Sequence, residues 1–162
     1  MHLPRDIERK TVSPPPSLDI TVEPLQLLKK QIQSALSPDL LTPQWRKIAE
    51  DKNNPMCGHC YAATEAAFWS LGGPKSDWTP QVVGNKQWSG SLQPGETHWF
   101  LKNSETGEIL DVTAGQFDTP VPYETGVSNG MMCHPKGGSR RARVILSRLR
   151  KNGVSYEADS AP

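Results

Sequence analysis

Three residues of the chain, Cys60, His98 and Asp111, are of the types that nucleophilic catalysis by a thiol requires. A thiolate attacks a carbonyl carbon, a nearby imidazole exchanges the proton, and a carboxylate fixes the tautomer of that imidazole. Cys60 begins a stretch rich in alanine and aromatic residues, which predicts a helix that ends at Gly72-Gly73. The free amides and the macrodipole at a helix start favour an anion. The position of Cys60 therefore predicts a reactive thiolate.

His98 and Asp111 lie in two predicted strands, 97–102 and 108–112, which are joined by a polar connection. We expect these strands to pair antiparallel, which brings the two side chains together. Asp111 then orients one imidazole nitrogen of His98 while the other nitrogen faces Cys60. The backbone amide of Cys60 is available as one donor to an oxyanion.

The elements that position these residues are predicted from hydrophobic periodicity and capping signals. An amphipathic helix is expected over 24–36, a short helix directly after Thr42, a strand at 81–83 and a final helix over 140–151. Helices followed by strands and a last helix indicate an α+β fold rather than a parallel doubly wound sheet. In this fold the helix that starts at Cys60 packs on a small antiparallel sheet.

Composition sets the limits of the folded part. The 162 residues include 15 prolines, and five of these fall within the first 24 positions. We therefore expect a flexible Pro-rich tail over 1–23, a single domain over 24–151 and a polar tail over 152–162. The net charge of +1 creates no global field for nucleic acid, and no apolar run is long enough to span a membrane. The start lacks a secretory signal pattern, so a cytoplasmic location is expected.

Several short blocks stand in order along the chain. They are Gly58-His59-Cys60-Tyr61-Ala62-Ala63, Thr97-His98-Trp99-Phe100, Asp111-Val112-Thr113-Ala114 and Gln116-Phe117. Together they resemble the YunG family of small bacterial and phage proteins. Their order and spacing are also similar, more distantly, to the papain-like and transglutaminase-like cysteine hydrolases. The resemblance covers roughly residues 40–125 and implies a papain-like or transglutaminase-like core.

The resemblance also implies roles for individual residues. Cys60 takes the place of the nucleophile, His98 that of the general base and acid, and Asp111 that of the orienting carboxylate. The activity so implied is a cysteine-dependent hydrolase or acyltransferase that cleaves an amide, thioester or isopeptide bond through an acyl-enzyme. The substrate expected is a protein, a peptide or a small amide-containing molecule, and neither an organic cofactor nor a metal is implied.

Three further residues are expected to support the site. Papain-like enzymes complete the oxyanion hole with an amide side chain that precedes the nucleophile, and Asn54, shorter than the usual Gln, occupies that position. Trp99 and Gln116 belong to the matched blocks and are expected to help form the site. Trp78 and Trp88, in polar surroundings, are candidates for a substrate groove.

The cysteines also allow two other interpretations. Cys57 and Cys60 form the Cys-x-x-Cys pattern of dithiol oxidoreductases, although no apolar strand precedes it as the thioredoxin context requires. The same pair, together with Cys133 and His134, offers four ligands for a structural zinc ion. Against this, adjacent side chains diverge and rarely both reach one ion.

An alternative from another functional class is a non-catalytic binding module, such as a phage or host-defence factor. It would use the Cys60/His98 cleft to hold a ligand or a partner. The six basic residues of 140–151 are interpreted as a solvated helix face rather than a nucleic-acid patch, because they lie opposite an apolar stripe.

Overall fold

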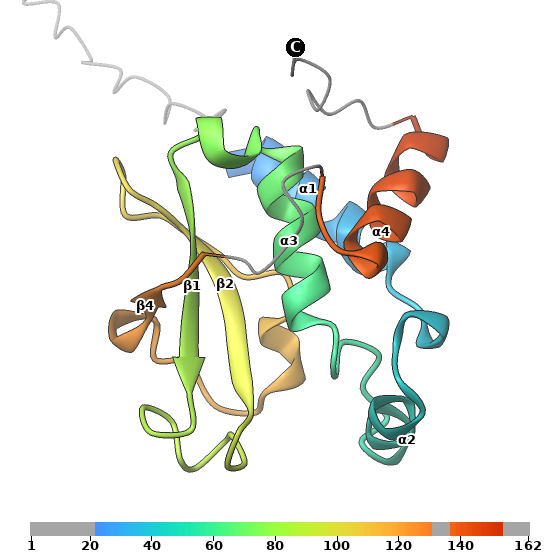
Figure 1. The fold of residues 1–162 in the computed structure, drawn as a ribbon, viewed down its shortest axis with the longest axis vertical. Coiled ribbons are helices and arrows are strands. Elements are labelled where there is room, and N and C mark those ends of the chain that lie inside the picture. The colour runs from blue at the N-terminus through green and yellow to red at the C-terminus, as the bar shows by residue number, and fades with distance from the viewer. Residues whose placement is uncertain (1–21, 131–136, 154–162) are drawn as a thin grey trace, which may run out of the picture.

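The computed structural model describes residues 22–130 and 137–153, which form helices and an antiparallel sheet (Figure 1). The helices are α1 (Val22–Ala35), α2 (Pro43–Asp51), α3 (Cys60–Ser70) and α4 (Arg140–Lys151), and the strands are β1 (Trp78–Gly84), β2 (Thr97–Asn103), β3 (Ile109–Leu110) and β4 (Val127–Ser128). Short 3-10 turns join them, among them η1 (Pro38–Leu40), η3 (Ala114–Gln116) and η4 (Tyr123–Thr125). The predicted α+β class is confirmed.

The sheet has the strand order β3-β2-β1-β4, and each neighbouring pair is antiparallel. β1 and β2 pair along all seven of their residues, whereas β3 pairs with β2 through Leu110 opposite Leu101 and its neighbour. The antiparallel pairing predicted for the two strands around His98 and Asp111 is therefore confirmed. β3 itself is shorter than the predicted strand 108–112, because only two of its residues pair with β2.

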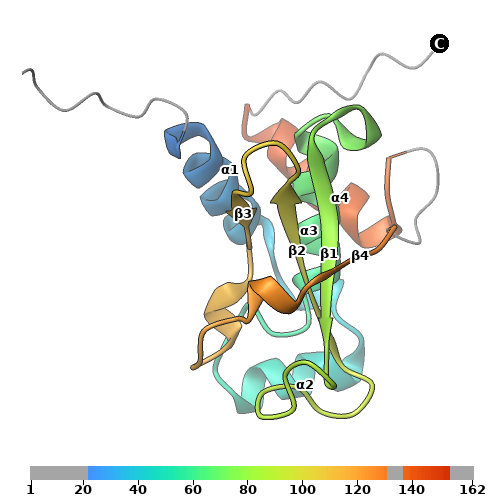
Figure 2. The ribbon, with the colours of Figure 1, turned by 90° about the vertical axis from the view of Figure 1, so that its left-hand side faces the viewer.

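The helix that starts at Cys60 packs on the sheet, as predicted. α3 contacts β1 and β2, and α1 and α4 pack against α3, so that the helices lie together behind the sheet when the sheet faces the viewer (Figure 2). Four alanines of α3 are completely buried and allow the neighbouring elements to approach closely: Ala62, Ala63, Ala66 and Ala67. Large side chains from α1, α4 and the strands fill the remaining core, including Ile32, Ile145, Leu149 and Leu101.

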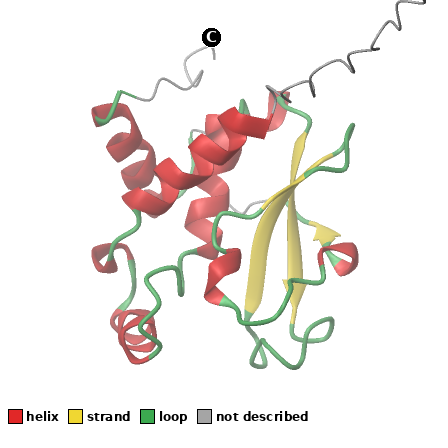
Figure 3. Ribbon diagram, turned by 180° about the vertical axis from the view of Figure 1, so that it is seen from behind, coloured by secondary structure: helices red, strands yellow, loops and turns green. Residues whose placement is uncertain are grey.

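The apolar stripe predicted for the last helix and the start predicted for the second helix are both confirmed. α4 buries the apolar stripe expected of it, which consists of Ala142, Ile145, Leu146 and Leu149. α2 starts with Pro43 at its first position, and the Thr42 hydroxyl caps it by accepting the Trp45 N–H at 3.4 Å. None of the residues of α2 is fully buried, so this helix forms a rim rather than a part of the core (Figure 3).

The structure corrects two predictions. Trp78 does not line a substrate groove, because it begins β1 and is only 9% exposed within the core. Its polar neighbours in the sequence misled the prediction, since alternate residues of a strand point to opposite faces. Arg148 does not belong to a solvated face either. Its guanidinium donates to the Ala35 carbonyl and forms an ion pair of 2.8 Å with Asp39, which ties α4 to α1 and η1.

Parts of the sequence-based prediction lie outside the described residues. These are most of the two predicted tails, 1–23 and 152–162, and both Cys133 and His134. The first helix begins at Val22, two residues before the predicted start of the domain. Among the described residues, no helix has the length and apolar character needed to cross a membrane.

Candidate active site

Cys60 is the first residue of α3 and is held there by a tight turn. Gly58 has φ +79, a left-handed conformation that favours glycine, and a Cβ at this position would lie 3.1 Å from Leu41 and 3.2 Å from Trp45. The turn therefore packs directly under α2. The amides of the first turn of α3, including that of Cys60, have no acceptor within their own helix. Backbone amides at a helix start stabilise negative charge that develops close to them.

His98 and Asp111 form a buried pair. The His98 Nε2 lies 2.7 Å from Asp111 Oδ2, and the two side chains are 0% and 3% exposed. If the register of β2 and β3 is continued by one residue, Phe100 is the residue opposite Asp111. His98 lies two residues before Phe100 on the same face of the sheet, so His98 and Asp111 are diagonal neighbours. The sequence separation of 13 residues is spanned by the connection between these strands. The structure thus brings together the two residues that the sequence placed in successive strands.

Asp111 is held by two further donors. Its Oδ1 accepts the Thr113 N–H at 3.0 Å, and its Oδ2 accepts the Tyr123 hydroxyl at 3.0 Å. Burial, together with the charge of Asp111 and the hydrogen bond to it, raises the pKa of Tyr123, so its hydroxyl remains a donor. Sequence reasoning missed Tyr123, because it lies in an irregular segment where no periodicity indicates a side chain's direction.

His98 is electrostatically tuned by its partners. Burial lowers the pKa of His98, but the hydrogen bond to Asp111, the hydrogen bond to Cys60 and the charges of both partners outweigh burial and raise this pKa to about 9. In the neutral imidazole, Nε2 carries the hydrogen donated to Asp111, which leaves Nδ1 as the acceptor that faces Cys60. This is the tautomer that a general base for a thiol requires.

The helix of Cys60 is also fixed to the strand of His98. The buried Thr64 hydroxyl donates to the Trp99 carbonyl at 2.9 Å, and the Trp99 ring meets Tyr61 edge-to-face at 5.1 Å. The Cys60 Sγ lies 3.6 Å from the Thr97 carbonyl oxygen. These contacts run along one side of β2, so a change in the packing of α3 also moves the nucleophile relative to the imidazole.

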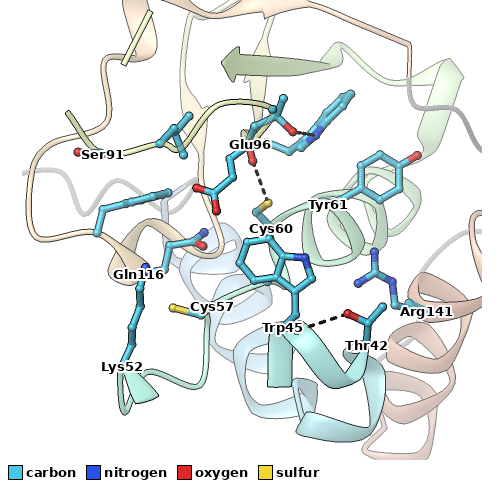
Figure 4. Close-up of a pocket in the computed structure, with 16 residues that line it drawn as sticks. Thr42, Trp45, Lys52, Cys57, Cys60, Tyr61, Ser91, Glu96, Gln116 and Arg141 are labelled. Atoms are coloured by element: carbon cyan, nitrogen blue, oxygen red, sulfur yellow. Dashed lines mark hydrogen bonds between the residues drawn. The ribbon is translucent and has the colours of Figure 1, made fainter. Parts of the chain in front are cut away.

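Cys60 opens into a cavity of about 310 Å³ (Figure 4). The cavity has aromatic walls, to which Trp45, Tyr61, Trp99 and Phe117 contribute, and its charged lining residues are Lys52, Glu96 and Arg141. His98 is completely buried behind this surface. The size is at the lower end of the range for small-molecule sites, about 300–1,000 Å³. A substrate in the cavity therefore contacts the Cys60 sulfur directly. It does not contact the imidazole of His98, which lies beneath the cavity wall.

The two amide side chains proposed as supporting residues have different positions. The Asn54 Nδ2 donates to the Gly115 carbonyl at 2.9 Å, and its Oδ1 accepts the Met56 N–H at 3.0 Å. Asn54 thus ties the loop before Cys60 to η3 and does not line the cavity of Cys60. Gln116 lines it, and its Nε2 lies 3.0 Å from Thr113 Oγ1 and 3.3 Å from the His98 Nδ1.

The tryptophans predicted near the site have distinct roles. Trp99 is buried, lines the cavity and donates from its indole nitrogen to Thr97 Oγ1 at 3.2 Å. Trp88 contacts Phe117 at a ring distance of 4.5 Å and His98 at 6.5 Å. Phe117 also packs edge-on against His98 at 4.8 Å. Trp88 and Phe117 therefore shield the imidazole from water, and Trp88 does not line the cavity as a groove residue would.

The cysteines give no support to the other two interpretations within the described part of the chain. α3 begins at Cys60 rather than at Cys57, and both thiols are free. Burial raises the pKa of Cys57, which disfavours it as an attacking thiolate. No group of three or more metal-ligating His, Cys, Asp or Glu side chains occurs among residues 22–130 and 137–153. The zinc interpretation also needs Cys133 and His134, which lie outside these ranges.

Comparison with protein-family models, with curated proteins and with solved structures found no match for this chain.

Proposed function

We propose that the protein is a cysteine-dependent hydrolase or acyltransferase with a papain-like or transglutaminase-like arrangement of Cys60, His98 and Asp111. The observation that carries the proposal is the placement of Cys60 at a helix start, close enough to His98 to raise the pKa of an imidazole whose Nε2 is held by a buried carboxylate at 2.7 Å. A thiol that only fills space in a core needs neither an imidazole nor a carboxylate behind that imidazole.

In the first half of the proposed reaction, the Cys60 sulfur forms a bond to the carbonyl carbon of an amide, thioester or isopeptide. Because the pKa of His98 is raised to about 9, the thiol proton already lies on Nδ1 of His98 before the attack, and the oxyanion accepts the backbone N–H of Cys60. The bond to the leaving group then breaks, and the leaving group takes the proton from Nδ1. Asp111 stabilises the imidazolium throughout by accepting the hydrogen bond from Nε2. The product of this half is an acyl thioester on Cys60.

Gln116 is the proposed second oxyanion donor. One of its amide hydrogens is directed at Thr113 Oγ1 and the other at the His98 Nδ1. With the thiol proton on Nδ1, this nitrogen accepts no hydrogen bond, so an N–H of Gln116 is available to the oxyanion. Asn54 takes a positioning role instead, because it holds Gly115, the residue directly before Gln116.

In the second half, His98 takes a proton from water or from an amine, and the resulting nucleophile attacks the thioester carbon. Cys60 leaves as a thiolate, and the free acid or the new amide is released. Water gives hydrolysis or deamidation, and an amine gives acyl transfer. The substrates that fit this chemistry are proteins, peptides or small molecules with an accessible amide or thioester.

The order of the three residues supports the resemblance to papain-like and transglutaminase-like enzymes and to the YunG family. The nucleophile begins a helix, the histidine lies on a following strand, and the carboxylate lies directly after the next strand of an antiparallel sheet. Membership of either family remains part of the proposal.

The test is alkylation of Cys60 by iodoacetamide at about pH 6, followed by peptide mass spectrometry. A thiolate paired with His98 reacts at this pH, and we expect His98→Ala to slow the reaction at least about tenfold. His98→Gln, which keeps a polar partner for Asp111, should be slowed similarly. Cys57 serves as an internal reference because it is 3% exposed and should react slowly in each protein. Equally slow alkylation of Cys60 in all three proteins would contradict the proposal.

One observation favours the alternative of a non-catalytic binding module. The His98 ring has no exposed surface, and its Nδ1 is also approached by Gln116. A protein that only holds a ligand in the cavity needs no proton transfer by this ring. For that function a folded Cys60→Ala variant should keep its ligand or partner, whereas loss of every measurable effect in that variant supports the enzyme.

A further inference from the structure

Arg141 brings a positive charge into the cavity of Cys60 from a different part of the chain. It lies in the first turn of α4, is half-buried, and lines the cavity together with Tyr61 and Thr42. In Figure 4, Arg141 lies on one side of Cys60, and Lys52 and Gln116 lie on the other. A substrate that occupies the cavity across Cys60 therefore passes close to the guanidinium.

No group of the described residues neutralises this guanidinium. The ion pairs of the described chain join Lys47 to Asp51, His98 to Asp111 and Arg148 to Asp39, and none includes Arg141. Arg148, on the same helix, differs in this respect. Its guanidinium donates hydrogen bonds to a carboxylate, a carbonyl and a hydroxyl of the protein itself.

The helix start places Arg141 at the positive end of the α4 dipole. The first turn of α4 contains no acidic residue, although the positive end of a helix dipole favours anions there. The nearby ring of His59 is neutral at pH 7, because burial and the charge of Arg141 lower its pKa to about 4. The buried Glu65 carboxylate, which accepts the Ser139 N–H at 2.8 Å, is the acidic group at this helix start, and it forms no ion pair with Arg141.

The other charged groups that line the cavity form no ion pair with Arg141. Glu96 brings a negative charge into the same cavity, but its carboxylate accepts the Gln93 N–H at 3.0 Å and forms no ion pair with Arg141. Lys52, at the opposite end, adds a second positive charge and is exposed on a flexible side chain. Arg141 is the better ligand for a carboxylate, since it is less exposed and its planar guanidinium matches the two oxygens.

We propose that Arg141 determines specificity by binding a carboxylate of the substrate, so that the enzyme acts on small or short amides that carry a negative charge beside the scissile bond. This inference rests on the proposed function of Cys60. The aromatic walls then contact the apolar part of the substrate, and the guanidinium fixes its direction across the sulfur. The carboxylate can be an acidic side chain or a free peptide terminus, because both offer the same two oxygens.

The test compares two alkylating agents that differ in charge at the same reactive carbon. In each case the Cys60 sulfur displaces iodide and forms a C–S bond, and the rate constants are measured by peptide mass spectrometry. The readout is the ratio of the rate with iodoacetate to the rate with iodoacetamide. We expect Arg141→Gln to lower this ratio about five-fold or more, since a nearby unit charge no longer attracts the anion.

Arg143→Gln is the matched control. Arg143 belongs to the same helix, is exposed and does not line the cavity, so its removal should leave the ratio unchanged. Arg141→Lys keeps the charge but loses the planar guanidinium, so the ratio should fall less than in Arg141→Gln. An unchanged ratio in Arg141→Gln, an equal fall in Arg143→Gln, or a fall in Arg141→Lys as large as in Arg141→Gln would each overturn the inference.

Three chloroacetyl probes distinguish the source of the carboxylate. They are chloroacetyl-glutamine amide, which is neutral, chloroacetyl-glutamate α-amide, with an acidic side chain, and chloroacetyl-glutamine, with a free terminus. We expect at least one charged probe to alkylate Cys60 faster than the neutral one, and this advantage to disappear in Arg141→Gln. If neither is faster, the inference fails. The proposed function fails separately, if iodoacetamide alone reacts as slowly with the wild type as with His98→Ala.

Discussion

At the scale of single residues, the candidate site is a chain of donors and acceptors that ends on Asp111. Its Oδ2 accepts from both His98 and Tyr123, and its Oδ1 accepts a backbone N–H. Three donors thus satisfy the oxygens of a carboxylate that is almost completely buried. The carboxylate in turn keeps the imidazole in the tautomer that presents Nδ1 to Cys60. Tyr123 is therefore a positioning residue, which acts on the Cys60 sulfur through Asp111 and His98.

This relation predicts the effect of Tyr123→Phe. The phenyl ring should keep its packing against Phe100, whose ring centroid is 4.9 Å away, while the hydrogen bond to Asp111 is lost. We expect the free energy of unfolding to fall by about 1–3 kcal/mol, as measured by urea titration, because the lost bond was made to a buried charge. The alkylation rate of Cys60 at about pH 6 should move toward that of His98→Ala.

The control for this variant is Thr125→Val. Thr125 belongs to the same turn, but its hydroxyl donates to the Pro122 carbonyl at 2.8 Å and not to Asp111. Its alkylation rate should equal that of the wild type. A Tyr123→Phe protein that loses stability but alkylates at the wild-type rate would show that Tyr123 supports only the fold.

At the scale of elements, the site depends on how one turn sets the start of α3. The turn at Gly58 must pass under α2, where the closest side-chain atoms belong to Leu41 and Trp45. α2 itself buries no residue fully, so this contact is a large part of what positions it. The same turn determines where the amide and the sulfur of Cys60 point. Stability and reactivity are therefore coupled at Gly58.

We expect Gly58→Ala to destabilise the protein by about 1–3 kcal/mol, because a Cβ is disfavoured at positive φ and also contacts Leu41 and Trp45 too closely. The alkylation rate of Cys60 should fall as well. Gly90→Ala is the control, since Gly90 is exposed, does not have a positive φ and has no atom within 4 Å of a Cβ. Its urea midpoint should remain close to that of the wild type, and a similar loss in both variants would contradict the explanation.

Sequence reasoning predicted the elements that local signals define. The change in composition at Cys60 marked a helix start, and the polar connection between the strands around His98 and Asp111 indicated that they pair. Contacts that depend on long-range packing were not predictable in this way. Tyr123 reaches Asp111 from an irregular segment, and Arg141 reaches the cavity from a helix that the sequence describes as amphipathic and solvated. Trp78 was misplaced because its neighbours are polar, whereas its own face of β1 is buried.

At the scale of the whole molecule, two buried histidines of opposite character surround Cys60. His59, directly before it, has its pKa lowered to about 4 by burial first and by the charge of Arg141 next. Burial also lowers the pKa of His98, but its bonds to Asp111 and Cys60 and their charges raise it to about 9. The fold thus disfavours a proton on one ring and favours a proton on the other.

These opposite shifts predict a stability maximum near pH 6.5, the ordinary pKa of histidine. Between about pH 4 and 6.5 the unfolded chain binds a proton at His59 that the folded protein does not, so stability falls on acidification. Between about pH 6.5 and 9 the folded protein keeps a proton on His98 that the unfolded chain loses, so stability falls as the pH rises. Each shift corresponds to roughly 3 kcal/mol.

Urea unfolding measured from pH 4 to 9 tests this prediction. His98→Gln cannot titrate at this position, so its stability should lack much of the alkaline decline, and His59→Gln should lack much of the acidic one. Each variant serves as the control for the other, because the change should be confined to one limb of the curve. An alkaline decline of wild-type size in His98→Gln would mean that the proton on His98 is not held by the fold, and the ion-pair basis of the proposed reaction would then be wrong.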